Sequence, residues 1–401
     1  MQKYLFIIIY LLISIIFALP IKEIAIIGNQ ITTDEFILNT IHHSVGDTVN
    51  TNLANQDMLN LYETGLFDDV TIYSPTDTLY SILVSEKQYT TMKPLFDKDD
   101  IMGLSIGGAL LFDNIQGENK KFELSLLFGE HSLYNLTYMN PQLKQTQDSI
   151  RIDIYNKQFE NIENEYIVDR VALQTLFSIP TGEKYAMQLA VAYEYNKLNI
   201  LINNKIQNNH SLALNMFCQK KNISNDNTFN IHYRATLFDK YYYNNNMIKL
   251  IHKYYIPFLR TSANARLLIQ NQFKINFSNV IPIYDKVYIG TEDYVRGYKA
   301  NPIENNTAIQ NKLKWNNIIV STLQWETLLA KKSYFNINLL LFMDFGLGNN
   351  HYKKFNLNNK IRSHGIGIRF DIIKFVNLDL CLGINPYGEK TFHVIVNTKK
   401  F

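Results

Sequence analysis

Apolar and polar side chains alternate along most of the chain beyond residue 103, in short segments separated by joints rich in Asn, Gly or Pro. The alternation is clearest from Tyr185 to Tyr195, where Tyr, Met, Leu and Val share one face and Ala, Gln and Glu the other. A period of two is typical of β-strands with one apolar face. About sixteen such segments fit between residues 103 and 398, each near the roughly 9–11 residues with which a tilted strand crosses a bilayer. The pattern predicts a barrel of about 16 antiparallel strands over 103–401.

The apolar face of these segments carries aromatic residues at its ends and aliphatic residues between them, which is typical of a lipid-facing band. A soluble β-sandwich or propeller would also alternate, with its polar face outward. The chain holds 26 Tyr and 24 Phe against 2 Trp, and its mean hydropathy is −0.14. A transmembrane barrel accommodates such a modest hydropathy because only every second residue faces lipid.

The amino terminus carries Lys3 and then a nearly unbroken apolar run from Leu5 to Leu19, followed by Pro20. This arrangement predicts a secretory signal peptide over residues 1–20. An uncleaved anchor is the alternative, but the run is shorter than the roughly 20 residues that a spanning helix needs. The prediction therefore places the mature chain outside the cytoplasm.

Residues 21–87 show a mixed pattern instead of regular alternation. A strand over 21–27 precedes a helix that starts near Thr32, and a second helical pattern over 52–62 ends at Gly65. Two further strands end at Glu86. The order strand, helix, helix, strand, strand predicts a small α+β domain, with 88–102 as a linker.

This segment resembles a POTRA domain, although a generic α+β domain would share much of the pattern. The matching positions are Gly28, Gly46, Gly65, Phe67, Val70 and Glu86. An exposed edge strand leaves backbone groups free to pair with an extended client. Ile82 and Val84, on the last strand of the domain, are the expected client-pairing positions.

A polar run, Gly290 to Tyr298, interrupts the alternating segments. Its Val295-Arg296-Gly297-Tyr298 resembles the V-R-G-Y loop of the outer-membrane assembly and secretion barrels, the superfamily of BamA, TamA and the two-partner-secretion transporters. The resemblance implies that the loop follows strand eleven, tucks into the barrel and brings Arg296 to Glu326 and Asp344. Strand parity independently directs both carboxylates into the lumen.

Guanidinium suits such a lock because its planar fork binds carboxylates in pairs of hydrogen bonds and keeps its charge. Gly297 permits a tight backbone there, and Tyr298 is expected to pack on the wall. A weak seam is expected between the first and last strands, Gly103–Phe112 and Lys390–Thr398. Its residues are Gly103, Gly107, Gly108, Phe392, Val394, Val396 and Phe401.

We identify no catalytic constellation in the sequence, and the two predicted domains leave no room for a hydrolase domain, so we expect no enzyme activity and no cofactor. The net charge of +3 comes without a basic tract, which gives nucleic-acid binding no support. Cys218 and Cys381 fall in distant strands and are expected as free, buried thiols. His42-His43 has no metal-ligand spacing and is expected on a solvated face.

These features predict a protein of a Gram-negative-type cell, with its barrel in the outer membrane and its POTRA-like domain in the periplasm. The expected function is insertion or translocation of unfolded β-barrel or secreted clients, with outer-membrane lipid and periplasmic accessory proteins as further partners. A dedicated two-partner secretion pore is an alternative, although that class usually has two POTRA domains and a plug helix. A passive porin is another, but it would leave the arginine loop without a purpose.

Overall fold

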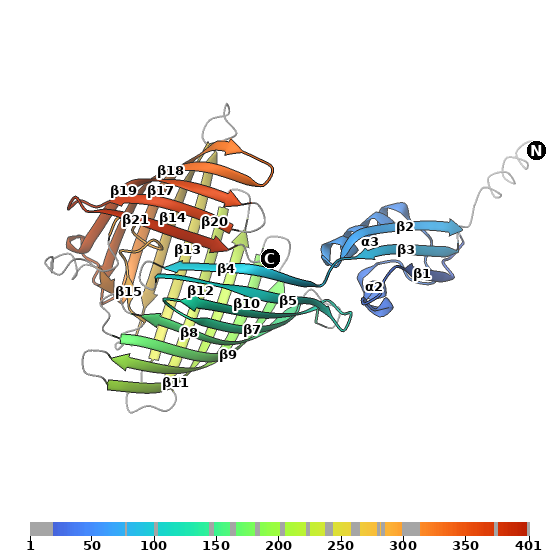
Figure 1. Cartoon of the computed structure of the whole chain (residues 1–401), viewed down its shortest axis with the longest axis horizontal. Coiled ribbons are helices and arrows are strands. Elements are labelled where there is room, and N and C mark those ends of the chain that lie inside the picture. The colour runs from blue at the N-terminus through green and yellow to red at the C-terminus, as the bar shows by residue number, and fades with distance from the viewer. Residues whose placement is uncertain are drawn as a thin grey trace, which may run out of the picture. The chain divides into compact units, whose positions relative to one another are not determined.

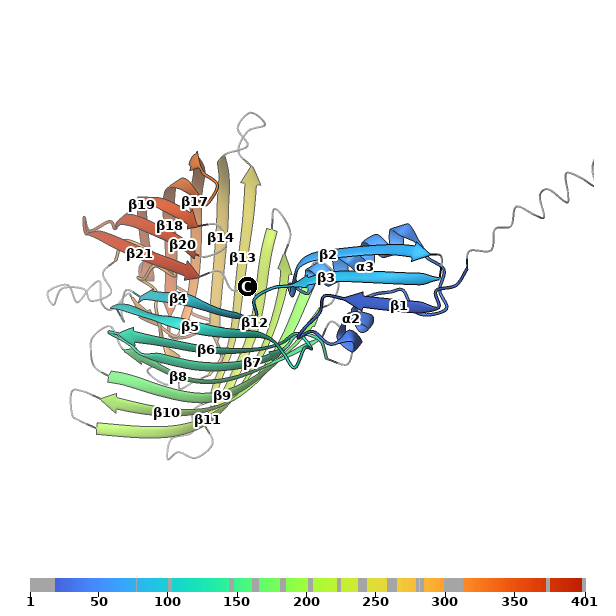
Figure 2. The same ribbon diagram turned by 45° about the vertical axis from the view of Figure 1, so that its right-hand side comes forward.

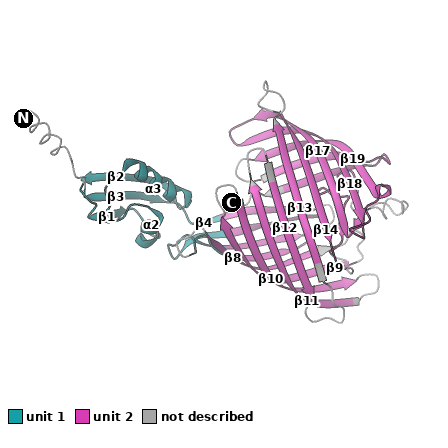
Figure 3. Ribbon diagram, turned by 180° about the vertical axis from the view of Figure 1, so that it is seen from behind, with its two compact units in different colours: residues 1–91, 111–122, 139–146 teal, residues 92–110, 123–138, 147–401 magenta. Residues whose placement is uncertain are grey.

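The computed structural model describes residues 19–76, 78–99, 103–143, 148–160, 166–180, 185–200, 205–221, 225–236, 244–257, 265–278, 281, 285–298, 313–372 and 376–398. The predicted signal peptide lies almost wholly outside these residues. The chain divides into two compact units (Figure 3). The first contains residues 1–91, 111–122 and 139–146, and the second contains the remainder.

The first unit contains a three-stranded sheet and two helices, in the predicted order. The elements are β1 (Glu23–Ile27), α2 (Asp34–Thr40), α3 (Thr51–Glu63), β2 (Phe67–Thr76) and β3 (Leu79–Glu86). The start of α2 is fixed by Thr33, whose hydroxyl accepts a hydrogen bond from the amide of Phe36. Figure 2 shows the three strands side by side, in the order β1-β3-β2.

The sheet order corrects the expected client-pairing strand. Strand β3 is central, because it pairs with β1 in parallel and with β2 antiparallel. Ile82 is 0% exposed and Val84 only 4%, since both belong to the apolar core of the unit. The open edges of this sheet therefore belong to β1 and β2, and the two residues cannot meet a client directly.

The expectation for His42 and His43 is also wrong in part. The two residues follow α2 in an irregular segment, and His43 is buried while His42 is exposed. Both rings contact the buried carboxylate of Asp57 on α3. His43 therefore belongs to a buried hydrogen-bond network, whereas His42 is solvent-exposed, as predicted.

The second unit is a nearly closed, 16-stranded antiparallel barrel (Figure 1). The strand order runs from β21 to β4 in reverse of the chain, omitting only the short β15 and β16. The strands are β4 (Thr90–Asp99), β5 (Gly103–Ile115), β6 (Lys120–Gly129), β7 (Leu133–Asn140), β8 (Ser149–Glu160), β9 (Tyr166–Pro180), β10 (Tyr185–Ile200), β11 (Lys205–Lys221), β12 (Asn225–Thr236), β13 (Asn244–Pro257), β14 (Ala265–Asn276), β17 (Asn317–Lys331), β18 (Phe335–Asn349), β19 (Lys360–Ile372), β20 (Val376–Ile384) and β21 (Lys390–Thr398).

The barrel begins earlier in the chain than the sequence pattern predicted. Strand β4 lies within the predicted linker 88–102 and forms one end of the sheet, so the glycines expected at the seam lie on the second strand, β5. Pro94 explains the difference, because proline argues against an inner strand but is tolerated in an edge strand. The seam lies between β4 and β21. Phe392, Val394 and Val396 are on β21, and Phe401 falls outside the described residues.

Burial follows the predicted parity. On β10, Leu189 is 45% exposed and Tyr193 44%, whereas Ala192 is 2% and Glu194 4% exposed. The apolar face of the strand thus points out of the barrel and the small, polar face points in. Among the described residues no helix has the length and apolar character needed to span a membrane.

Candidate functional site: the inward loop

The connection between β14 and β17, residues 277–316, is here called the inward loop, and its residues 285–298 and 313–316 pack into the barrel. Its described part forms a two-residue ladder between β15 (Val287–Tyr288) and β16 (Lys314–Trp315). Its apolar side chains join lumen-facing residues of β17 and β19 in one buried cluster. The cluster consists of Val287, Ile289, Val295, Tyr298, Leu313, Ile318, Val320 and Ile361. The lumen at this level is therefore filled by packed side chains.

Two glycines on the lumen face of β18 make room for the loop. A Cβ on Gly346 would lie 2.8 Å from Ile289 Cδ1 and from Val295 Cγ2. A Cβ on Gly348 would lie 1.9 Å from Trp315 Cδ1. The sequence Gly346-Leu347-Gly348 is thus a signal of loop docking that inspection of the strand pattern alone missed.

Arg296 is held inside the barrel by Asp344 of β18, as the resemblance implied. Its Nε donates to Asp344 Oδ2 over 2.8 Å and its Nη2 to Oδ1 over 2.9 Å, while its backbone amide reaches Oδ2 over 3.1 Å. The residue is 6% exposed and Asp344 is 2% exposed. The guanidinium carbon also lies 3.6 Å from the centre of the Phe342 ring. This fork-to-carboxylate geometry needs both nitrogens and the planar face, which lysine lacks.

Glu326 does not bind Arg296 directly, which corrects the prediction. Arg296 Nη1 donates to Gln324 Oε1 over 2.8 Å, and Gln324 Nε2 donates to Glu326 Oε1 over 2.7 Å. The cationic partners of Glu326 are Arg266 at 2.6 Å and Arg369 at 2.9 Å. Gln324 precedes Glu326 by two positions on the same face of β17, so it stands between the arginine and the predicted acid.

The loop tip also contacts the last two strands. Gly297 has φ +92°, and a Cβ there would lie 3.0 Å from the amide nitrogen of Ile384. Its own amide donates to Nε2 of His393 on β21 over 2.8 Å, and His393 is 0% exposed. The Tyr298 hydroxyl donates to the carbonyl of Arg362 over 3.0 Å. The loop tip is therefore bonded to a strand of the seam, through a histidine that the sequence analysis did not single out.

A second ion-pair cluster holds the base of the loop. Arg234 on β12 donates through Nη1 to both oxygens of Asp285, over 2.6 and 2.8 Å. The same guanidinium lies 2.8 Å from Glu194 of β10. Lys274 Nζ donates to the Asp285 carbonyl over 3.4 Å. Strand parity on β10 pointed Glu194 inward, but its partner on the loop could not be identified from spacing.

The POTRA-like motif residues occupy structural positions in the first unit. Gly28, Gly46 and Gly65 all have positive φ, and a Cβ on Gly28 would lie 2.1 Å from the Val84 carbonyl oxygen. Phe67 and Val70 are core residues at 1% and 2% exposure. The Glu86 carboxylate accepts the amides of Ile31 and Thr32, which fixes the loop before α2. Burial alone would raise the pKa of Glu86, but these hydrogen bonds hold it below its usual range.

Neither cysteine is in a disulfide, and Cys381 is buried while Cys218 is partly exposed. Within the described residues, no group of three or more His, Cys, Asp or Glu side chains is placed to hold a metal ion.

Comparison with known proteins gives two family matches. The model described as the Omp85 superfamily domain matches residues 114–245 and 238–378. The POTRA model, described as a surface antigen variable number repeat, matches residues 19–87. No curated protein sequence matches the chain.

Solved structures share the fold at low identity. BamA from Haemophilus ducreyi lacking POTRA domains 1–3 aligns with a TM-score of 0.76 and 15% identity, over 95% of this chain and 85% of that one. CdiB from Acinetobacter baumannii aligns with a TM-score of 0.58 and 15% identity, over 94% and 72%. CdiB from Escherichia coli aligns with a TM-score of 0.59 and 10% identity, over 94% and 75%. The resemblance predicted from the sequence and the predicted fold class are both confirmed.

Proposed function

Because the chain belongs to the Omp85 superfamily, we propose that it inserts unfolded β-barrel proteins into the outer membrane. The barrel lies in the outer membrane and the POTRA domain in the periplasm. The observation that carries the proposal is Arg296, which lies buried on Asp344 inside a barrel of 16 strands that follows a POTRA domain. Such a buried pair fixes one conformation of the inward loop against β18, and the neighbouring Gly297 bonds His393 on the seam strand β21.

The client is captured first by the POTRA domain. Its sheet has two edges, β1 with five residues and β2 with ten. Longer edges offer more backbone groups to an extended segment, and pairing through the backbone tolerates many client sequences. The client therefore pairs with β2, which replaces the expected pairing at Ile82 and Val84.

The client then passes to the seam between β4 and β21. Pro94 removes one backbone donor from β4, and Gly107 and Gly108 add no packing side chains to β5. Each of these features weakens pairing at the first strands of the barrel. A client strand that adds to an edge there would start its own sheet on the template that the edge provides.

The function proposed is not enzymatic, and it needs no nucleotide, metal or other cofactor. The chemistry consists of exchanging one set of backbone hydrogen bonds for another. Outer-membrane lipid and periplasmic accessory proteins are the further partners proposed.

Reconstitution of the full-length chain in liposomes tests the proposal. A urea-unfolded, eight-stranded OmpA-type barrel is added outside, and its folded fraction is followed by gel mobility. We expect the wild type to accelerate folding and Arg296→Ala to remove most of the acceleration. Arg266→Ala is the matched control, since that arginine is 52% exposed and bonds the same acidic network through Glu326. Equal rates with empty liposomes and with the wild-type chain would contradict the proposal.

A secretion pore of the two-partner type is the second candidate, and the fold shared with the two CdiB proteins over 94% of this chain favours it. In the same liposomes a pore would move an extended client into the lumen without folding it in the bilayer. Protection from added protease, without the gel shift of a folded barrel, would identify this activity. A passive porin is disfavoured because the apolar cluster of the inward loop occupies the lumen.

A further inference from the structure

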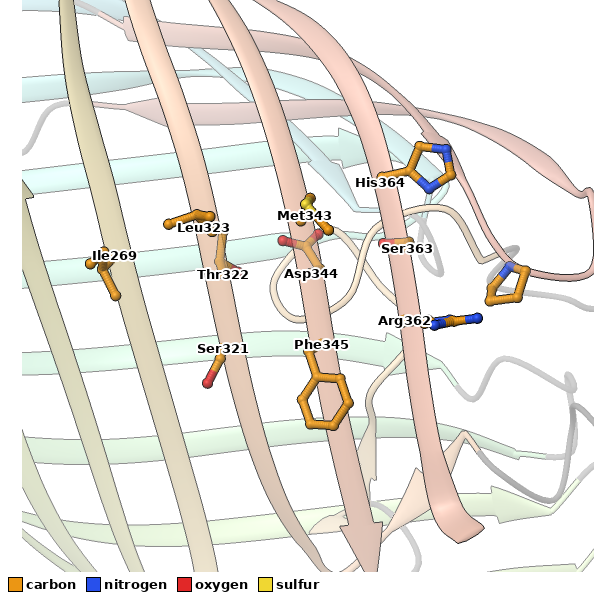
Figure 4. Close-up of a pocket in the computed structure, with 11 residues that line it drawn as sticks. Ile269, Ser321, Thr322, Leu323, Met343, Asp344, Phe345, Arg362, Ser363 and His364 are labelled. Atoms are coloured by element: carbon orange, nitrogen blue, oxygen red, sulfur yellow. The ribbon is translucent and has the colours of Figure 1, made fainter. Parts of the chain in front are cut away.

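A groove runs along the outward, lipid-facing side of β14, β17, β18 and β19. Its upper part, about 520 Å³, is lined by side chains of Ile269, Leu323, Met343 and Phe345. Figure 4 shows Ile269, Leu323, Met343 and His364 on neighbouring strands, and the strand register makes them one row. A second hollow of about 420 Å³ shares Leu323, Met343 and His364 with the first and continues past Trp325 and Ile366.

Basic side chains gather at one end of this groove. Lys360, Arg362 and His364 alternate along β19 and are all exposed on its outward face. Lys353 and Lys354 lie in the connection just before them. Within the described residues, no hydrogen bond or ion pair of the structure engages the side chains of Lys360, Arg362 or His364.

The same surface carries no acidic counterpart. The outward-facing positions of β17, β18, β19 and β20 include neither Asp nor Glu in the described part of these strands. The nearest acidic residue of the adjoining turn, Glu389, accepts a hydrogen bond from Asn385 over 2.7 Å. A positive surface thus sits directly beside an apolar groove.

The chain topology places this surface at the outer leaflet. The chain leaves the periplasmic POTRA domain at Glu86 and enters β4 at Thr90, so β4 starts at the periplasmic end. Because neighbouring strands are antiparallel, β19, the fourteenth strand in order, starts at the outer end. Lys360 and Arg362 therefore lie at headgroup depth, where charge on the lipid face of a barrel costs little.

We infer that this surface is a binding site for one anionic, phosphate-bearing lipid of the outer leaflet. The phosphate is bound by Lys360 and Arg362, with His364 as a further hydrogen-bond donor, and an acyl chain lies in the groove over Met343. Guanidinium suits a phosphate because its fork donates two parallel hydrogen bonds. The site goes beyond client handling, and it anchors the strands that bear Asp344 to the membrane.

The chain carries its own reporter for this site. It contains two tryptophans, of which Trp325 lines the groove on the outside, while Trp315 belongs to the inward loop and packs against its buried apolar cluster. A brominated acyl chain quenches the fluorescence of a tryptophan that it touches. Full-length protein in phosphatidylcholine nanodiscs, doped with brominated phosphatidylglycerol or with brominated phosphatidylcholine, therefore reports which lipid occupies the groove.

We expect brominated phosphatidylglycerol to quench Trp325 more than brominated phosphatidylcholine at the same fraction. This preference, here called the enrichment, is that of the groove for the anionic lipid over phosphatidylcholine. It should fall about fivefold for each charge removed, equivalent to about 1 kcal/mol, in Lys360→Gln and in Arg362→Gln. Added salt should reduce it as well. Trp325→Phe should abolish the lipid-dependent signal, because Trp315 lies inside the barrel.

Lys197→Gln is the matched control, since Lys197 is an exposed, outward-facing base near the outer end of β10. It should leave the enrichment unchanged. Equal quenching by both lipids in the wild type, or an enrichment that survives in Lys360→Gln/Arg362→Gln, would overturn the site. Because the readout is lipid contact, the result is independent of whether the chain inserts clients.

Discussion

Asp57 is a fully buried carboxylate in the POTRA domain, surrounded by hydrogen-bond donors. It accepts the His42 amide over 2.6 Å, the His43 ring over 2.6 Å and the Tyr80 hydroxyl over 3.0 Å. His43 Nε2 accepts the amide of Asn50, so its Nδ1 carries the proton toward Asp57. Burial alone would raise the pKa of Asp57, but these hydrogen bonds hold it below its ordinary value.

A lowered pKa in the folded state means that Asp57 stabilises the POTRA domain above the pKa of the unfolded chain, about 3.9. This contribution is lost as the pH falls below that value. We expect Asp57→Asn to destabilise the domain by about 2–3 kcal/mol at neutral pH, because its amide hydrogens would face donors. Hydrogen exchange of residues 41–84 in the full-length chain, corrected for intrinsic rates, measures the effect.

The difference between Asp57→Asn and wild type should shrink when exchange is measured below about pH 4, since the unfolded wild-type chain then binds a proton that the folded Asp57 carboxylate does not. Asp68→Asn, at an exposed position on β2, serves as the control and should change exchange little at either pH. A constant difference across the pH range would refute a role for the carboxylate charge.

The residues that surround Arg296 inside the barrel differed in how far they could be predicted from the sequence. Arg296 and Asp344 followed from a loop motif and from strand parity, which depends only on counting by twos. Glu326 was placed on the correct face, but parity does not fix the partner of a side chain among several lumen groups. His393 was missed because a lone histidine on an alternating strand has no distinguishing spacing, and only the folded chain brings it to Gly297.

At the scale of elements, the POTRA sheet was predicted correctly in sequence order but not in spatial order. The pattern of strands and helices does not show that β3 inserts between β1 and β2, because this order depends on how the helices cross over. Each of the three strands nonetheless carries one side chain of similar exposure, so client contact can be compared between the strands. Ile27 on β1, Tyr73 on β2 and Leu83 on β3 are 48%, 45% and 41% exposed, respectively.

A photo-crosslinking side chain placed at each of these three positions identifies the client-binding edge. With the unfolded OmpA-type barrel as client, we expect the strongest adduct at Tyr73, since β2 is the longer open edge. Leu83 is the control, because it is exposed but lies on the central strand β3, which has no open edge. Equal yields at all three positions, or a maximum at Leu83, would exclude pairing on β2.

Strand β4 shows the limit of alternation as a predictor. Its sequence contains Pro94 and several polar residues, which indicated a linker, and only its place at the end of the sheet makes proline acceptable. The glycines on β18 show the converse. Gly346 and Gly348 weaken a strand in isolation, but they are needed where the inward loop approaches its backbone.

At the scale of the whole barrel, the inward loop joins walls that are distant in strand order. Its base is bonded to β12 through Asp285 and Arg234, and its tip is bonded to β18 and β21 through Arg296 and Gly297. Strand β12 is ninth in the order and β21 is last. We therefore expect the loop to couple the two walls, so that the loss of one anchor weakens the hold of the other.

A double-mutant cycle tests this coupling. Arg234→Ala and His393→Ala each remove one anchor, and distant sites normally give additive changes in the free energy of unfolding, within about 0.3–0.5 kcal/mol. If both act on one loop, the second loss should cost less after the first, so the double variant should be less destabilised than the sum by more than about 0.5 kcal/mol. Urea unfolding of the reconstituted barrel measures the four stabilities.

Arg151→Ala replaces His393→Ala in the control cycle, because Arg151 pairs with Asp153 on its own strand, β8. That cycle should be additive. If the Arg234 and His393 cycle is additive as well, the two anchors hold independent parts of the barrel. The loop would then be fixed at two independent points. A change in the Gly297–His393 hydrogen bond would not affect the Arg234–Asp285 ion pair on the other side of the lumen.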